Sequence, residues 1–472
     1  NCSLRDVIVV DEAGKLVNVL SYLSLISTAK DSVKNVAVYG QGFVGITLAA
    51  ALANLGHQVY GVDVQESLIE SLRENQLHVI EPSLNDVVNT TQELGKLVFA
   101  VDLNNEKVDY HIVAVGTPVD NKGVVNLEAL EDVVGSIGRR LKRGDVVMLR
   151  STVPVGTTRN VVRQILGEVS GLKAGTDFHL AFTPERTAEG KAMEELRTLP
   201  QIVGGLTAHC ARRSMELWSS LTDSVVQVES LEAAELVKLI NNSYRDLAFS
   251  FANAVAMLSD QFNINSFKLI NAANEGYPRN PISLPSPGVG GYCLTKDPFL
   301  FASVDPNAGH ARLAVTARLI NDQAQSYVLT QLERYLDKVG KKIRNSKILI
   351  VGLAFKGWPE TNDLRSSSSV FVAEALLDKQ ALVFGYDSVI SPKEWKKVLP
   401  NVEAGNLEND IVDSDVVLLM NNHPNNIPKN FLTLVKKGGG KLVFDGWSQL
   451  DFNTFNSLKG VEYATMGFLS NK

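Results

Sequence analysis

A hydrophobic run that leads into closely spaced glycines constrains the fold of this chain more than any other feature. Residues 34–45 read Lys-Asn-Val-Ala-Val-Tyr-Gly-Gln-Gly-Phe-Val-Gly, and an Ala- and Leu-rich stretch follows to Leu55. A second apolar run then ends at Asp63. This order of strand, glycine turn, helix, strand and acid predicts a βαβ unit that binds a dinucleotide.

The turn and the acid indicate which dinucleotide binds. Asp63 lies 18 residues past Gly45, close to the spacing expected for a carboxylate that accepts a hydrogen bond from a ribose 2′-hydroxyl. A carboxylate there repels a 2′-phosphate, and no Arg or Lys follows at positions 64–66. NAD is therefore favoured over NADP. The predicted cofactor-binding residues of this unit are Gly40, Gly42, Phe43, Val44, Gly45 and Asp63.

The same pattern returns in the C-terminal third of the chain. The run that ends at Gly40 is echoed by the one that ends at Gly352, and the run that ends at Asp63 by the one that ends at Asp387. We therefore expect a second Rossmann-like domain. Its turn, Gly352-Leu-Ala-Phe-Lys356, lacks the glycine fingerprint, so a second NAD is not expected there in the same way. Lys356 could instead reach a phosphate; the alternative is a structural duplication without a ligand.

A glycine-rich loop surrounds one cysteine. Residues 285–297 read Pro-Ser-Pro-Gly-Val-Gly-Gly-Tyr-Cys-Leu-Thr-Lys-Asp. The glycines would let a substrate carbon approach Cys293, and Lys296 supplies positive charge that favours the thiolate needed for nucleophilic attack. We interpret Cys293 as a nucleophile. The alternative is a structural cysteine on a tight turn.

A helical pattern around residue 235 offers a cation and an amide. Lys238 and Asn242 are four residues apart, so they share one face of the helix. The apolar neighbours of Lys238 indicate a mostly buried helix, where an unpaired lysine is costly unless a developing negative charge awaits it. The alternative is a solvated helix face.

Composition excludes several classes of protein. The net charge of −6 and the scattered basic residues argue against a nucleic-acid partner. No apolar run approaches the ~20 residues that span a bilayer, so no membrane partner is expected. Cys2, Cys210 and Cys293 are too few and too dispersed for a disulfide framework or a zinc site, which fits a reducing cytoplasm. Because the sequence begins with Asn, an upstream segment or a removed targeting peptide stays open.

We expect an α/β fold with two Rossmann-like, doubly wound parallel-sheet domains joined by a central helical region. The segment from about 308 to 339 is predicted to form a long spine helix and a subunit interface. An apolar pattern from Val7 predicts an N-terminal β-hairpin with a glycine-containing turn. The expected regions are an N-terminal extension (1–34), a NAD-binding domain (35–228), a helical central and dimerisation domain (229–340) and a C-terminal nucleotide-sugar-binding domain (341–472).

From about residue 35 to its end, the chain closely resembles the UDP-glucose/GDP-mannose dehydrogenase family. Several independent motifs occur in the family's order, which is more specific than any one of them. They are the glycine turn, Ser151–Thr158, Pro184–Gly190, the Glu235–Asn242 helix, the Cys293 loop, and Gly352–Lys356 followed by Thr361–Arg365.

The resemblance implies a four-electron oxidation of the C6 alcohol of a UDP-sugar to a uronic acid, for surface polysaccharide precursors, by a homodimer or higher homo-oligomer. Cys293 would carry a thiohemiacetal and then a thioester. By analogy, Lys238 and Asn242 stabilise oxyanions. Protons and the hydrolytic water fall to Asp297, Glu185, Glu189 and Thr152. Further cofactor contacts are expected from Thr117, Pro118, Thr152 and Lys296, and substrate contacts from Glu185, Arg279, Gly290, Gly291, Lys356 and Arg365.

Departures from the family concern the cysteine loop, the helix before it and the substrate. Thr295 replaces the usual proline after the cysteine, and Asn253 is followed by Ala where Glu is common. Val289 stands where the UDP-glucose branch usually has an aromatic residue, which leaves room near the sugar. Lys296 argues in the opposite direction, because many acetylhexosamine enzymes lack it. We expect a UDP-N-acetylhexosamine, with UDP-glucose 6-dehydrogenase as the alternative.

Two other classes of function stay open. A two-electron dehydrogenase of the hydroxyacid type would share the Rossmann unit, the lysine and the amide, but would have no use for Cys293 or for a second Rossmann domain. A non-enzymatic NAD-sensing protein would need only the glycine turn.

Overall fold

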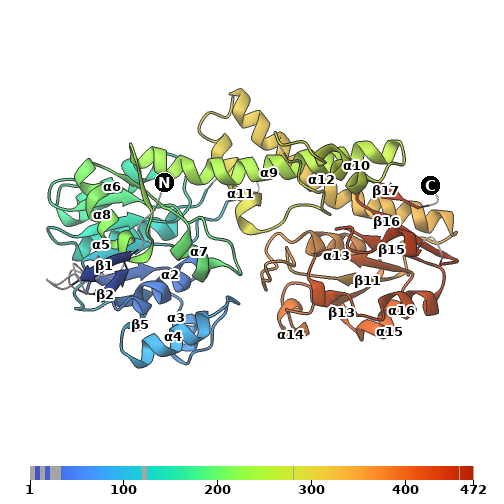
Figure 1. The fold of residues 1–472 in the computed structure, drawn as a ribbon, viewed down its shortest axis with the longest axis horizontal. Helices are drawn as coiled ribbons and strands as arrows, with labels where there is room; N and C mark the ends of the chain where they lie inside the picture. Colours follow the sequence, from blue (N-terminus) through green and yellow to red (C-terminus); the bar gives the residue numbers. More distant parts are fainter. Residues whose placement is uncertain are drawn as a thin grey trace.

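Two α/β domains lie side by side and are joined along one edge by long helices (Figure 1). The computed structural model describes residues 6–10, 16–21, 33–119, 125–279, 281–455 and 458–470. At the N-terminus, β1 (Asp6–Val10) pairs antiparallel with β2 (Leu16–Ser21). The predicted hairpin pairing is therefore confirmed, while its turn lies outside the described residues.

The first domain contains an eight-stranded sheet in the order β10-β9-β8-β7-β6-β3-β4-β5. The six strands from β3 to β8 are parallel, whereas β9 runs antiparallel to β8 and β10 runs parallel to β9. The sheet is thus doubly wound, as predicted, with two reversed strands at one edge. The strands are β3 (Asn35–Tyr39), β4 (Gln58–Val62), β5 (Leu97–Ala100), β6 (Tyr110–Val113), β7 (Val146–Leu149), β8 (His179–Phe182), β9 (Gln201–Gly205) and β10 (Val225–Val228).

Helices cover the first sheet. The central strand β3 is apolar on both faces, as expected for a strand that lies between helical layers. The small residues of α2 are buried, which lets this helix pack closely against the sheet. The helices are α2 (Phe43–Asn54), α3 (Glu66–Arg73), α4 (Leu84–Glu93), α5 (Glu128–Arg140), η1 (Thr158–Val162), α6 (Arg163–Ser170), α7 (Ala192–Thr198) and α8 (Ala208–Leu221).

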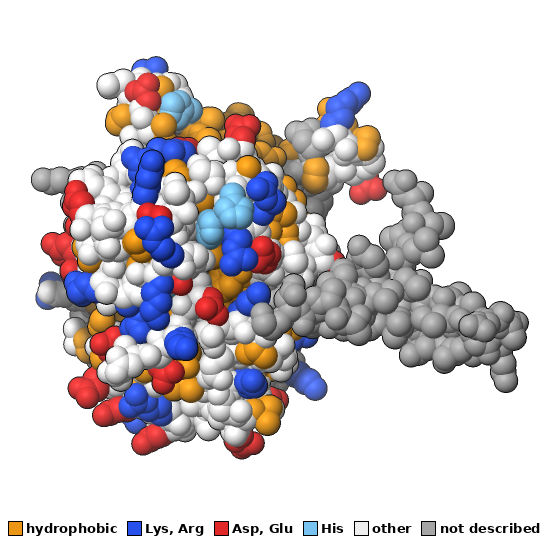
Figure 2. Space-filling model, turned by 90° about the vertical axis from the view of Figure 1, so that its left-hand side faces the viewer, with side chains coloured by type: hydrophobic (Ala, Val, Ile, Leu, Met, Phe, Trp, Pro, Cys, Tyr) orange, Lys and Arg blue, Asp and Glu red, His pale blue; other side chains and the backbone are white. Residues whose placement is uncertain are grey.

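The charged side chains at one end of the first domain are mixed in sign. On this face, Lys and Arg, Asp and Glu, and hydrophobic side chains are interspersed (Figure 2). Within the described residues, no helix is both long enough and apolar enough to span a bilayer.

The second domain repeats this plan with a seven-stranded sheet in the order β13-β12-β11-β14-β15-β16-β17. Only β17 is antiparallel to its neighbour. The strands are β11 (Lys347–Val351), β12 (Leu382–Tyr386), β13 (Glu403–Ala404), β14 (Val416–Leu419), β15 (Lys441–Asp445), β16 (Val461–Thr465) and β17 (Phe468–Leu469). The helical segments are α13 (Ser368–Asp378), α14 (Pro392–Trp395), α15 (Leu407–Asp413), η2 (Pro424–Asn426), α16 (Phe431–Gly438) and α17 (Phe452–Phe455).

The duplication confirms the echo in the sequence, since β11, β12 and β14 occupy the places of β3, β4 and β6. The two turns differ in their hydrogen bonds. In the second domain, Asp387 accepts hydrogen bonds from the backbone amides of Leu353 and Ala354 at 2.7 and 3.2 Å. In the first domain Asp63 likewise accepts the Gln41 amide, so the bond from Ala354, at the place of Gly42, is what distinguishes the second turn.

Two long helices bridge the domains. α9 (Leu231–Gln261) begins in the core of the first domain and reaches the core of the second, where Ala256 is buried. α12 (Gly309–Lys338), the predicted spine helix, packs on the second domain. Between them lie α10 (Ser266–Asn274) and α11 (Tyr292–Ala302). At 1.5 Å per residue, α9 is about 46 Å long, so it fixes parts of both domains to one rigid element.

Candidate functional site

Cys293 is the second residue of α11, two residues after the helix N-cap Gly291. Solvent reaches its side chain, although protein groups surround it. Burial raises the pKa of the thiol and outweighs Lys238 and Lys296, which lower it; Asp297 and Glu189 also raise it. Most of the predicted catalytic groups therefore lie around one sulfur atom.

α9 supplies the lysine and the amide predicted for this site. Lys238 and Asn242 are both buried. The Asn242 Nδ2 donates a hydrogen bond to Asp297 Oδ2 at 2.5 Å. The prediction that this helix is mostly buried is wrong in part, because Ile240 is exposed. Lys238 is buried because its face of α9 packs on α11.

Lys296 connects the cysteine loop to the first domain. Its Nζ donates to Thr117 Oγ1 at 3.4 Å, and Thr117 in turn donates to the Thr152 carbonyl at 2.5 Å. The same Nζ lies 3.4 Å from Asp297 Oδ1. Thr117 and Thr152 follow β6 and β7, so they lie at the carboxyl edge of the sheet, and Pro118 is exposed beside Thr117.

The glycine turn fits a dinucleotide. Gly40 has a φ of +88°, and a Cβ there would lie 2.9 Å from the Ala114 carbonyl oxygen at the switch point between β3 and β6. Gly42 caps α2 without a side-chain hydrogen bond, and a Cβ on it would meet open space. Uncapped amides at Phe43 and Val44 therefore face an open approach, which suits a pyrophosphate.

Asp63 follows β4 at the same edge of the sheet and is partly exposed. One of its oxygens accepts the Gln41 backbone amide at 2.7 Å and the other accepts that of Gln65 at 3.0 Å. The carboxylate is thus fixed beside the glycine turn, where the adenosine ribose of a dinucleotide is expected.

Glu185 is buried in an ion pair that sequence patterns did not reveal. The buried Arg150 donates to Glu185 Oε2 through both Nε, at 2.9 Å, and Nη2, and the Thr187 amide donates to Oε1 at 2.7 Å. Burial opposes ionisation, but Arg150, Thr187 and Lys238 outweigh it and lower the pKa of this carboxyl. A carboxylate held in this way is a weak proton acceptor.

Glu189 joins the two domains. Its Oε2 accepts a hydrogen bond from Thr361 Oγ1 at 2.8 Å, and its Oε1 lies 3.9 Å from Arg365 Nη2. Lys356 Nζ donates to the Glu189 carbonyl at 2.7 Å. Burial and Asp363 raise the pKa of Glu189, against the effect of the neighbouring donors. A raised pKa suits a group that carries protons near neutral pH.

The glycines of the cysteine loop face the second domain. A Cβ on Gly290 would lie 2.5 Å from the Ser366 carbonyl oxygen, and one on Gly291 would lie 2.8 Å from the Phe355 ring. Gly291 also has a φ of +88°. Close approach of the second domain therefore accounts for these glycines without a substrate.

Arg279 lies between α10 and the cysteine loop. It follows α10, is exposed, and places its guanidinium 5.2 Å from the centre of the Tyr277 ring. Arg245, which no sequence pattern singled out, lies near Lys356, because burial and then the charge of Arg245 lower the pKa of Lys356. Its position seven residues after Lys238 on one helix was the available signal.

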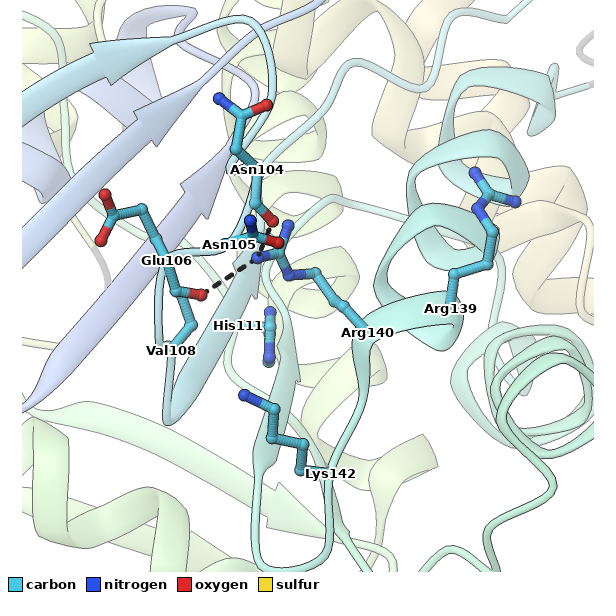
Figure 3. Close-up of a pocket in the computed structure, with 8 residues that line it drawn as sticks. All are labelled: Asn104, Asn105, Glu106, Val108, His111, Arg139, Arg140 and Lys142. Atoms are coloured by element: carbon cyan, nitrogen blue, oxygen red, sulfur yellow. Dashed lines mark hydrogen bonds between the residues drawn. The ribbon is translucent and has the colours of Figure 1, made fainter.

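A separate cavity of about 300 Å³ lies elsewhere in the first domain (Figure 3). Arg140 donates there to the carbonyls of Asn104 and Glu106, and the buried His111 bonds Tyr39 at 2.9 Å. None of the predicted site residues lines it. Its lining residues are Asn104, Asn105, Glu106, Val108, His111, Arg139, Arg140 and Lys142. Within the described residues, no three His, Cys, Asp or Glu side chains are grouped to hold a metal ion.

Three domain models of one family match the chain in order. Residues 34–222 match its NAD binding domain, residues 232–323 its central domain and residues 349–452 its UDP binding domain. The chain belongs to the UDP-glucose/GDP-mannose dehydrogenase family. It is accordingly a NAD-dependent nucleotide-sugar dehydrogenase, which confirms the predicted enzyme class and the predicted cofactor.

Relatives of this dehydrogenase cover most of its length. It is 34% identical over 357 residues to UDP-N-acetyl-D-mannosamine dehydrogenase of Yersinia pestis, which covers 74% of this chain and 83% of that protein. It is 31% identical over 399 residues to NDP-N-acetyl-D-galactosaminuronic acid dehydrogenase of Ralstonia nicotianae, which covers 83% of this chain and 91% of that protein.

Solved structures show the same architecture. A UDP-D-ManNAc dehydrogenase from Pyrococcus horikoshii has a TM-score of 0.82 at 28% identity, over 92% of this dehydrogenase and 99% of that chain. A UDP-glucose dehydrogenase from Pyrobaculum islandicum has a TM-score of 0.81 at 26% identity, over 93% and 98%. The predicted fold class is confirmed by these neighbours.

Proposed function

We propose that this dehydrogenase oxidises the C6 alcohol of a UDP-N-acetylhexosamine to the carboxylate in two two-electron steps. The observation that supports this most is the position of Cys293, which lies between Lys238 of α9, Lys296 beside the first sheet and Glu189 at the second domain. A solvent-reachable thiol at this junction has no role in a simple alcohol dehydrogenase.

The thiol divides the oxidation into stages. When bound at the glycine turn and Asp63, NAD would supply the hydride acceptor for both oxidations, one molecule for the alcohol and a second for the covalent adduct. Between these events Cys293 adds to the aldehyde, and its S–C bond makes a thiohemiacetal whose loss of hydride leaves a thioester. Water then cleaves the S–C bond, which releases the carboxylate and restores the thiol. Four electrons leave the sugar, and two NADH form.

The groups around Cys293 stabilise oxyanions, transfer protons and position one another. Lys238 and Asn242 stabilise the oxyanions at C6, since both are buried on one helix face. The charge of Lys238 acts on the Cys293 thiol, and Asn242 bonds Asp297, whose charge also acts on it. Asp297 orients Asn242 through their 2.5 Å hydrogen bond. Glu189 handles protons and the hydrolytic water, and Thr152, which Thr117 connects to Lys296, assists. Glu185 positions its loop through the ion pair with Arg150.

The second domain and α9 supply the charge for the UDP moiety. Lys356 and Arg365 lie in the segment between β11 and α13, and the charge of Arg245 on α9 acts on Lys356. We assign NAD binding to residues 35–228, dimerisation to 229–340 and UDP-sugar binding to 341–472, with no role assigned to 1–34. Gly290, Gly291 and Arg279 stay candidate substrate contacts. Because Cys293 must stay reduced to act as a nucleophile, we place the enzyme in the cytoplasm. We assign its uronic acid product to the synthesis of surface polysaccharides.

An N-acetylated sugar is favoured by Val289 and by the Yersinia and Ralstonia relatives, whose names refer to N-acetylated sugars. UDP-glucose is the second candidate, because the Pyrobaculum UDP-glucose dehydrogenase is as similar in structure as the Pyrococcus enzyme. The test is NADH formation with UDP-GlcNAc, UDP-ManNAc, UDP-glucose and GDP-mannose at matched concentrations. A higher kcat/KM for UDP-glucose or GDP-mannose would contradict the acetylhexosamine assignment.

The covalent stage has its own test. Cys293→Ala should abolish carboxylate formation while UDP-sugar binding stays within about threefold, because the thiol forms a bond and does not hold the ligand. Cys210→Ala, at a buried free cysteine remote from α11, is the control. Continued production of uronate by Cys293→Ala would exclude the covalent route.

A further inference from the structure

A buried arginine on α12 holds the cysteine loop by two carbonyls. Arg318 is almost fully buried. Its Nη2 donates to the Val289 carbonyl at 3.0 Å and its Nη1 to the Leu294 carbonyl at 3.4 Å. These carbonyls flank the four residues that include Gly290, Gly291, Tyr292 and Cys293. One guanidinium is therefore hydrogen-bonded at both ends of the segment that carries the thiol.

The same guanidinium is tied to the catalytic face of α9. Arg318 Nη1 lies 2.8 Å from Asp246 Oδ1. Asp246 is fully buried and follows Asn242 by four residues and Lys238 by eight, so the three share one helix face. The distance between Cys293 and the α9 groups is thus constrained through Arg318 as well as through Asn242 and Asp297.

Further buried amides complete this connection. Asn321 Nδ2 donates to the Asp246 carbonyl at 2.9 Å and to its Oδ1 at 2.8 Å. Asn253 Nδ2 donates to Asn321 Oδ1 at 2.9 Å, while Asn253 Oδ1 accepts the Ser286 amide at 2.9 Å. The start of the cysteine loop is therefore also attached to α9. Burial raises the pKa of Asp246 to about 6, although Arg318 and Asn321 oppose it, so the carboxylate is ionised at neutral pH.

We infer that Arg318 is a positioning residue, which acts through the backbone of the cysteine loop to place the Cys293 thiol against the oxyanion-stabilising face of α9. The inference rests on the proposed role of Cys293. A planar guanidinium suits the task because it can direct separate N–H groups to two carbonyls and a carboxylate, which a lysine ammonium at the same place cannot match.

Arg318→Lys is the first test, since it keeps the positive charge and removes the planar guanidinium that bonds two carbonyls and a carboxylate. Capture of the aldehyde depends on the thiol's position, so oxidation of the UDP-sugar 6-aldehyde should lose about 10- to 100-fold in kcat, the range expected for a displacement near 1 Å. The KM for the aldehyde and the Kd for NAD should change by less than about threefold. The rate of Cys293 alkylation by iodoacetamide should also change, which reports the thiol without catalysis.

Arg334→Lys is the matched control. Arg334 pairs with Asp260, so it also joins α12 to α9, but it is remote from the cysteine loop. An equal loss in both variants would overturn the inference, as would an unchanged aldehyde kcat in Arg318→Lys. If Arg318→Lys does not fold, Asp246→Asn is the second variant to test. This change keeps the side-chain shape but weakens the bond between Arg318 and α9. Full activity of Asp246→Asn would contradict the inference. One NADH per sugar from the unmodified enzyme would instead refute the proposed four-electron reaction.

Discussion

The Cys293 thiol lies among charges of both signs, and its ionisation depends on which of them are near. Burial keeps its pKa above the ordinary value, and two lysines act in the opposite direction. Because the folded-state pKa is raised, the thiolate fraction at a given pH is smaller than that of an ordinary cysteine and grows as the pH rises. Activation therefore depends on local groups and on the bound substrate.

Lys238→Ala should lower turnover by about 10²–10³, since it removes a donor that stabilises an oxyanion. It should also shift the pH dependence of Cys293 alkylation to higher pH, because the variant lacks a cation that lowers the thiol pKa. Stopped-flow NADH formation and iodoacetamide kinetics measure the two effects. Lys379→Ala, a surface lysine paired with Glu333, is the control. Near-normal turnover of Lys238→Ala would indicate that Lys238 has a structural role and does not stabilise an oxyanion.

Asp63 should determine the choice between NAD and NADP. Asp63→Asn keeps an acceptor for the Gln41 amide but loses the charge that repels a 2′-phosphate. We expect the kcat/KM ratio of NAD to NADP to fall by about tenfold or more, chiefly through KM for NADP. Equal use of both cofactors by the unmodified enzyme would show that Asp63 points away from the ribose.

At the residue scale, sequence patterns predicted what is local. Lys238 and Asn242 are four residues apart on one helix, so their shared face follows from helical geometry alone. Arg150 and Glu185, or Arg318 and Asp246, are 35 and 72 residues apart, and no periodicity links them. The sequence also offered no sign that Gly290 and Gly291 pack against Phe355 and Ser366, because that contact depends on the placement of a whole domain.

At the scale of elements, α9 has two different faces. One carries Lys238, Asn242 and Asp246 toward α11 and α12. The other exposes apolar side chains that no described residue covers. Those exposed by more than two-fifths are Ile240, Tyr244, Phe251, Leu258 and, just past the helix, Phe262. Several are separated by seven residues, which places them along one line of the helix.

This apolar line should form the subunit interface that we propose. Introducing charge with Phe251→Glu and Leu258→Glu together should shift a dimer to monomers, because two unpaired carboxylates would be buried in the interface. Analytical ultracentrifugation at several protein concentrations measures the change. Leu94→Glu, at an exposed leucine of the first domain, is the control. The interface would be contradicted if the unmodified enzyme were monomeric at all concentrations. It would also be contradicted if the double variant stayed dimeric.

Element boundaries were predicted where local chemistry sets them. The spine helix expected from about 308 to 339 is α12, Gly309–Lys338, and the duplicated strands follow from the repeated apolar runs. The antiparallel pairing of β9 with β8 was not predicted, since strand direction depends on the path of the connecting segments.

At the scale of the whole molecule, the two domains meet directly as well as through α9. Gly190 of the first domain has a φ of +83°, and a Cβ on it would lie 2.7 Å from Pro359 Cβ and 2.8 Å from the Glu360 carbonyl oxygen of the second. Beside it, Glu189 bonds Thr361. This contact brings the proposed UDP-binding residues toward the catalytic ones.

Gly190→Ala should push the domains apart at this contact. We expect the KM for the UDP-sugar to rise by about tenfold, while the Kd for NAD, which binds within the first domain, stays within about twofold. Gly144→Ala is a matched control, since Gly144 has a φ of +90° and open space around its Cβ position. Equal effects in both variants would indicate backbone strain alone and would refute the role of the domain contact.

The raised pKa of Cys293 also bears on how long the enzyme survives. Peroxide oxidises thiolates far faster than thiols, and oxidation past the sulfenic acid is not readily reversed. A nucleophile whose pKa is raised carries less thiolate than an ordinary cysteine and is therefore less readily oxidised, even though solvent reaches it. The arrangement that makes the free thiol slow to react preserves it until a sugar aldehyde is present.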